Sequence, residues 1–85
     1  MARTFLHDEM VAILADNGGG WMAAADIADL VNVRGAYQRT LRAKMLDVEA
    51  GQILLRAWKR PNMFEINGYQ VRLKHTRTGN EDEAA

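Results

Sequence analysis

A row of polar and charged side chains recurs at helical spacing late in the chain. Glu49, Gln52, Arg56 and then Lys59 or Arg60 stand at i, i+3, i+7 and i+10 or i+11, so a helix would place them on one face. Arg and Lys donate hydrogen bonds to O6 and N7 of guanine, and Gln can pair with adenine through two bonds. The row therefore has the chemistry of a helix that reads base edges in the major groove of DNA. A solvated helix face with ordinary charges explains the same pattern without a ligand.

Two further groups of basic residues flank this row. The first group precedes it and contains Arg39, Arg42 and Lys44, whereas Arg72 and Lys74 follow it. Cations of this kind hold phosphates, which sets affinity and its salt dependence but not the choice of sequence. The alternatives are a solvated loop for the first group and, for the second, charges that protect the edge of a sheet.

Charge is unevenly distributed along the chain, although the formal net charge is zero. Residues 1–33 carry one base against five acids, residues 34–77 carry ten bases against three acids, and residues 78–85 carry three acids. A chain divided in this way can hold a polyanion on its basic half, because summed surface charge steers charged partners. The division favours DNA binding. The zero total favours a protein-interaction module instead, whose acidic helices would dock on polymerase or another DNA-handling partner.

The remaining residues argue against catalysis and against a membrane location. The chain has 85 residues and no cysteine, which excludes disulfides and thiolate metal sites. His7 and His75 lie outside any acid–nucleophile arrangement, and the glycines at 18–20 lack the Lys-Ser/Thr of a phosphate-binding loop. No segment approaches the ~20 apolar residues of a membrane span, and the first residues do not resemble a signal peptide. We expect a cytoplasmic protein, nucleoid-associated if it binds DNA, that is not an enzyme and has no cofactor, metal site, membrane contact or small-molecule substrate.

Apolar spacing and helix breakers predict two helices in the first half of the chain. The first helix is capped by Thr4 and stopped by the glycines at 18–20. Trp21 and Met22 form a short apolar link, which is long enough for one small strand. A second helix over residues 23–33 then ends at Gly35.

The middle of the chain predicts one uncertain segment and one clear helix. Residues 36–46 are interpreted as irregular with a helical turn. Residues 47–60 are predicted to form a third helix, capped by Asp47 and ended by Pro61. Its inward stripe consists of Ile53, Leu54, Ala57 and Trp58, and Trp21 and Trp58 are both expected to anchor the core.

Residues 63–73 alternate between apolar and polar residues around Asn67-Gly68. Asn-Gly is the strongest sequence signature of a two-residue hairpin turn, because both central residues need positive φ. The apolar face of this hairpin would carry Phe64, Ile66, Val71 and Leu73. The predicted fold class is α+β, mainly α, with three helices followed by a C-terminal β-hairpin wing. One winged helix-turn-helix domain would span residues 1–77, and residues 78–85 would form an acidic disordered tail.

Three runs of the sequence carry a resemblance to a known family. The run from residue 27 to 37 (IADLVNVRGAY), the pair Gln52-Ile53, and the run from 62 to 73 (NMFEINGYQVRL) together resemble the HARE-type winged helix. That family occurs in the delta subunit of bacterial RNA polymerase and in restriction-associated proteins. One departure lies in residues 40–46, which are longer than the corresponding turn and lack its glycine. The resemblance implies DNA binding, although some relatives act through protein contacts.

Taken together, these patterns predict a winged-helix protein that binds double-stranded DNA and regulates transcription or another DNA transaction. The third helix would enter the major groove, while the basic loop and the wing would contact phosphates. A protein partner or a homodimer is also compatible with the sequence. The expected DNA-contacting residues are Gln52, Arg56, Lys59, Arg60, Arg39, Arg42, Lys44, Arg72 and Lys74.

Overall fold

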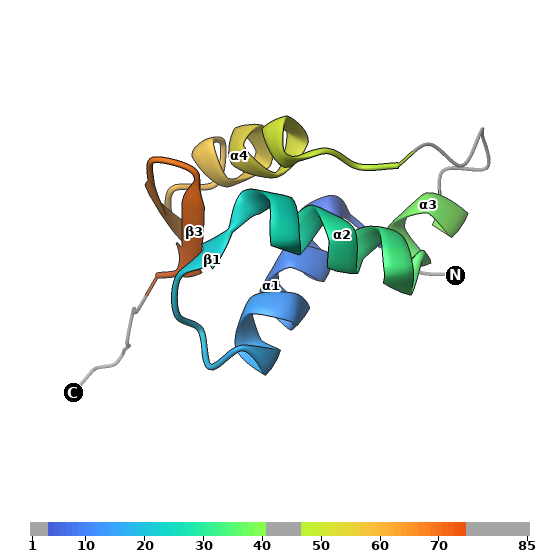
Figure 1. Cartoon of the computed structure of the whole chain (residues 1–85), viewed down its shortest axis with the longest axis horizontal. Coiled ribbons are helices and arrows are strands. Elements are labelled where there is room, and N and C mark those ends of the chain that lie inside the picture. Colours follow the sequence, from blue (N-terminus) through green and yellow to red (C-terminus); the bar gives the residue numbers. More distant parts are fainter. Residues whose placement is uncertain (1–3, 41–46, 75–85) are drawn as a thin grey trace.

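The chain folds into a small α+β domain that is mainly helical, as predicted. The computed structural model describes residues 4–40 and 47–74, and this part contains four helices and a three-stranded antiparallel sheet. The prediction of three helices is wrong, because residues 36–40 of the segment interpreted as irregular form a short helix of their own. The elements in chain order are α1 (Leu6–Asp16), β1 (Met22–Ala23), α2 (Ala24–Arg34), α3 (Ala36–Thr40), α4 (Ala50–Trp58), β2 (Phe64–Asn67) and β3 (Gln70–Leu73). Helix α2 contacts both α1 and α4, and the sheet lies at one end of the helices (Figure 1). Arg42, Lys44 and the tail at 78–85 fall outside the described residues.

The core is formed where the three long helices meet the sheet. Its largest fully buried side chains come from α1, α2, α4 and β3, and they are Met10, Leu14, Ile27, Val31, Ile53 and Val71. Because β3 contributes Val71 from the middle of the sheet, the hairpin is part of the core and not an appendage. None of the helices in the described residues is long and apolar enough to cross a membrane.

The hairpin forms as predicted, but its turn lies one residue further along. Phe64 pairs with Leu73 and Asn67 pairs with Gln70, so Gly68 and Tyr69 are the two turn residues. Gly68 has φ of 62°, a conformation that L side chains rarely adopt. The predicted turn at Asn67-Gly68 is therefore wrong, because Asn67 still belongs to the ladder.

In both helices the N-cap lies one or two residues later in the chain than predicted. Phe5, and not Thr4, is the N-cap of α1, and its N–H donates to Asp8 Oδ2 at 3.1 Å. Helix α4 begins at Ala50 with Glu49 as its N-cap, so Asp47 does not cap it. In both helices a side chain at the third position reaches back to the cap N–H, which satisfies one of the orphan donors of the helix start.

The end of α2 is fixed by a glycine and by an asparagine. Gly35 has φ of 70° and donates its N–H to the carbonyl of Val31, which ends the helix as predicted. Asn32 lies one turn earlier and bridges to the segment that leads into α4. Its Oδ1 accepts from Val48 N–H and Gln38 Nε2, both at 2.7 Å, and its Nδ2 donates to Val48 O at 3.0 Å. These bonds tie the start of α4 to α2.

Neither tryptophan anchors the core, which corrects the prediction. Trp58 is 70% exposed at the last position of α4, while Ile53 and Ala57 are buried. Trp21 is 37% exposed, and the Arg72 guanidinium lies over its ring at 4.6 Å from the centroid. Both rings therefore lie at the surface, and Trp58 is the more exposed of the two.

Candidate nucleic-acid interface

The outer face of α4 brings part of the predicted row together. Gln52, Arg56 and Lys59 line one shallow pocket of about 150 Å³ together with Leu55. The pocket is completed by Leu6 and Tyr37. Gln52, Leu55 and Lys59 are exposed, whereas Arg56 is half-buried on the side that faces α1. The predicted spacing therefore does place these polar side chains on a common surface.

Gln52 has a structural role that the sequence interpretation did not assign. Its Oε1 accepts from the Glu49 N–H at 2.8 Å and so closes the capping box of α4. The bond holds the amide on the first turn of the helix. An amide oxygen has two lone pairs, so Nε2 and the second lone pair of Oε1 remain for a ligand.

Arg56 is held against α1 by a histidine. Its Nη1 lies 3.1 Å from His7 Nδ1, and Phe5 stacks on the His7 ring with centroids 5.3 Å apart. Burial lowers the pKa of His7 below its usual value, the positive charges of Arg60 and Arg56 lower it further, and Asp8 opposes them. A neutral His7 can accept a hydrogen bond from Arg56, while the other guanidinium donors stay available for an anion.

Lys59 and Arg60 are the cations most available at this face. Both are exposed at the end of α4, and neither has a side-chain hydrogen bond or ion pair to any residue within 4–40 or 47–74. When two such cations neutralise phosphates, counterions are released from the DNA, and this release is the main source of the salt-dependent affinity of proteins for DNA.

The wing cations are already engaged within the domain. Arg72 Nε donates to Glu65 Oε1 on the neighbouring strand, and its guanidinium also covers Trp21. Lys74 Nζ donates to the carbonyl of Pro61 at 3.2 Å. Strand β3 lies between β1 and β2, so Arg72 does not protect a sheet edge. Of the two, Lys74 has the less neutralised charge, because Pro61 offers only a carbonyl.

The remaining predicted cations lie away from α4 or beyond the described residues. Arg39 is exposed on α3, and its Nη1 donates to the carbonyl of Arg34 at 3.4 Å. Arg34 itself forms an ion pair with the buried Glu9 at 2.8 Å, and this hydrogen bond raises the pKa of Arg34. The pair joins α1 to α2, so Arg34, the first base of residues 34–77, stabilises the fold.

Sequence reasoning missed two exposed apolar side chains on α4. Leu55 is 53% exposed and Trp58 is 70% exposed, so the helix presents apolar as well as cationic groups. The signal was available, because each residue of a helix is rotated by about 100° from the one before it. Leu55 and Trp58 both lie off the buried stripe set by Ile53 and Ala57.

Comparisons with known proteins add no family to this description. No protein-family model, no curated protein and no solved structure matches the chain. Within the described residues, no group of three or more His, Asp or Glu side chains is placed to hold a metal ion. The case for a function therefore depends on topology and surface chemistry.

Proposed function

We propose that this chain is a winged helix-turn-helix protein that binds double-stranded DNA and regulates transcription or another DNA transaction. Helix α4 would lie in the major groove, and the hairpin β2–β3 would be the wing. The chain order of helix, short strand, helices and hairpin supports the proposal, as does the sheet order β1-β3-β2, which packs the wing against the helical core.

One observation carries the DNA-binding part of the proposal. Arg56 lies on α4, and the exposed Lys59 and Arg60 follow at its C-terminal end, whereas the acidic N-cap Glu49 lies at the opposite end of the helix. Cations grouped along the second half of a helix and just after it can neutralise phosphates or donate to guanine. Arg39 and Lys74 would add phosphate contacts at the two sides, and so would Arg42 and Lys44, which lie outside the described residues.

The test measures the binding of a random-sequence DNA duplex by fluorescence anisotropy at several salt concentrations. Replacing Lys59 and Arg60 with alanine should weaken binding and reduce the slope of log K against log salt by about two, because each phosphate contact contributes roughly one. Both side chains are exposed and make no bond to a described residue, so the fold should be unaffected.

A control with the same change in net charge separates local contacts from overall charge. Ala15→Glu with Ala25→Glu lowers the net charge by two, as the test variant does, at exposed positions on α1 and α2. The control should leave the salt slope nearly unchanged. Equal slopes for the test variant and the control would contradict a DNA-binding α4, and so would the absence of binding at low salt.

A further inference from the structure

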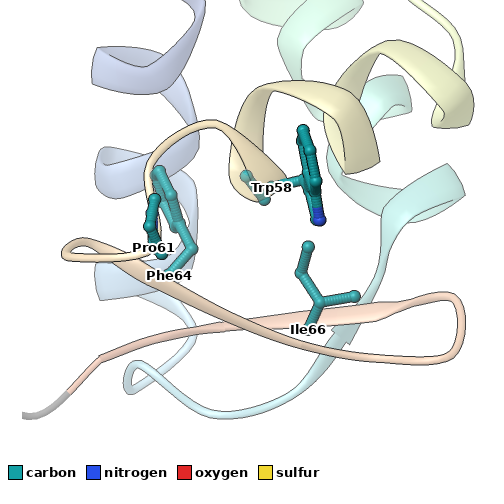
Figure 2. A pocket seen from close by; sticks show the side chains of 5 residues that line it. Trp58, Pro61, Phe64 and Ile66 are labelled. Carbon is teal, nitrogen blue, oxygen red and sulfur yellow. The ribbon is translucent and has the colours of Figure 1, made fainter.

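An apolar groove lies beside α4, on the side of the hairpin. It has a volume of about 420 Å³ and is lined by Ala57, Trp58, Pro61, Phe64 and Ile66. Trp58 and Ile66 point toward one another across it, and Pro61 lies beside Phe64 (Figure 2). Trp58 is 70% exposed and Ile66 is 37% exposed, so the groove leaves a large apolar surface in water.

Positive charge lies close to the groove near Pro61 and Trp58. Lys59 and Arg60 directly follow Trp58, and the Lys74 ammonium reaches the carbonyl of Pro61. The nearby Glu65 forms an ion pair with Arg72, so its charge does not offset these cations. The groove therefore fits an apolar ridge that carries acidic side chains.

The outer face of α2 has this chemistry. Asp26, Asp29, Leu30 and Val33 stand at i, i+3, i+4 and i+7, and all four are exposed. Val33 is 81% exposed and Leu30 is 42% exposed, so this face presents two apolar side chains beside its carboxylates. Neither carboxylate has an ion pair with a residue in the described part of the chain.

We propose that the α2 face of one copy of this chain docks in the α4–β2 groove of a second copy. Leu30 and Val33 would cover Trp58 and Ile66, while the two aspartates would approach the cations at the rim. Opposite charges around an apolar centre match in both sign and polarity. The zero net charge of the chain permits this association, because no overall repulsion opposes it.

The symmetry of such an assembly follows from the two surfaces being different. Each copy offers one α2 face and one groove, so the contact is heterologous, and successive copies form an open chain or a ring. A two-fold dimer would instead bring two identical patches together. This difference makes the proposal testable by mixing variants.

The experiment is sedimentation of the full chain without DNA, so its outcome does not depend on the proposed DNA binding. In the first variant, Asp29→Lys with Val33→Ser removes the α2 face; in the second, Trp58→Ser removes the groove. The wild type should grow beyond a dimer as its concentration rises. Each variant alone should stay monomeric, with a dissociation constant raised at least about tenfold, because the first reverses a charge and loses an apolar contact, and the second loses a tryptophan, a residue type enriched among interface hot spots. An equal mixture should give a one-to-one pair that grows no further, because each variant retains only one surface.

Several results would overturn the proposal. The wild type could stay monomeric at every concentration, or the variants could assemble as the wild type does. The mixture of variants could give no pair. The wild type could also form a dimer that grows no further and that persists when the α2 face is removed. Tyr69→Ser is the matched control, because it removes an 81% exposed aromatic at the hairpin turn and should leave assembly unchanged. If Trp58→Ser does not fold, Lys59→Glu with Arg60→Glu blocks the rim of the groove and should give the same monomer and the same mixed pair.

Discussion

Asn32 links two parts of the fold that are distant in sequence, and replacing it with alanine should destabilise the whole domain. Its amide makes three hydrogen bonds, two to the backbone of Val48 and one to the side chain of Gln38. Val48 and Gln38 are both buried. Alanine would remove the Asn32 partner of both the Val48 N–H and the Val48 carbonyl, at the point where the chain enters α4.

The size of the effect follows from these bonds. One intramolecular hydrogen bond contributes about 0.5–1.5 kcal/mol, and a buried group left without a partner costs more. Three bonds therefore predict a loss of about 2–4 kcal/mol in the free energy of unfolding. For a domain of this length such a loss lowers Tm by roughly 10–25 °C. Gln38 Oε1 already lacks a partner among the described residues, so the Gln38 side chain has no second bond within them to compensate.

The assay is urea unfolding followed by circular dichroism, with Asn62→Ala as the matched control. Asn62 is exposed in the turn before β2 and makes no hydrogen bond to a described residue, so its loss should change stability by less than about 0.5 kcal/mol. If Asn32→Ala lowered the free energy of unfolding as little as Asn62→Ala, water would be replacing the amide at no cost. That result would refute the role of Asn32 in fixing the start of α4.

Three further predictions concern glycines and His7. Gly35→Ala should cost about 1–2 kcal/mol in urea unfolding, because φ is 70° and the new Cβ would lie 3.1 Å from Arg39 Nη1. Gly51→Ala should instead stabilise by up to ~1 kcal/mol, since no atom lies within 4 Å of the new Cβ and the residue is helical; a loss of stability would contradict this. The folded pKa of His7 lies below its usual 6.5, so the unfolded chain takes up its proton first as the pH falls. Stability should therefore decrease below about pH 6.5 in the wild type more steeply than in His7→Gln, and equal pH profiles would show that His7 is not responsible.

The hairpin shows why a sequence pattern can predict a face correctly and a turn incorrectly. Moving the turn by one residue shifts each pairing partner by two positions. Because side chains alternate with period two along a strand, a shift of two keeps every side chain on the same face. Phe64, Ile66, Val71 and Leu73 therefore remain on the predicted face, with Phe64 opposite Leu73 and Ile66 opposite Val71.

The errors on α4 have two different physical origins. The capping box of Glu49 and Gln52 was visible in the sequence as an acceptor three residues after the cap, so Asp47 was the wrong choice. The exposure of Trp58 follows from helix geometry and from a hairpin that leaves this flank open. The bonds of Asn32 span 16 residues to Val48, and no local pattern reports a contact of that range.

The central position of β3 has a consequence for folding during synthesis on the ribosome. Chains emerge from their N-terminus, yet the strand that pairs with both β1 and β2 is the last of the three to be synthesised. Until residues 70–73 are outside the exit tunnel, Met22 and Ala23 lack their ladder and the core lacks Val71. The helices can form and pack earlier, but the sheet and the part of the core that contains Val71 can be completed only after β3 has emerged.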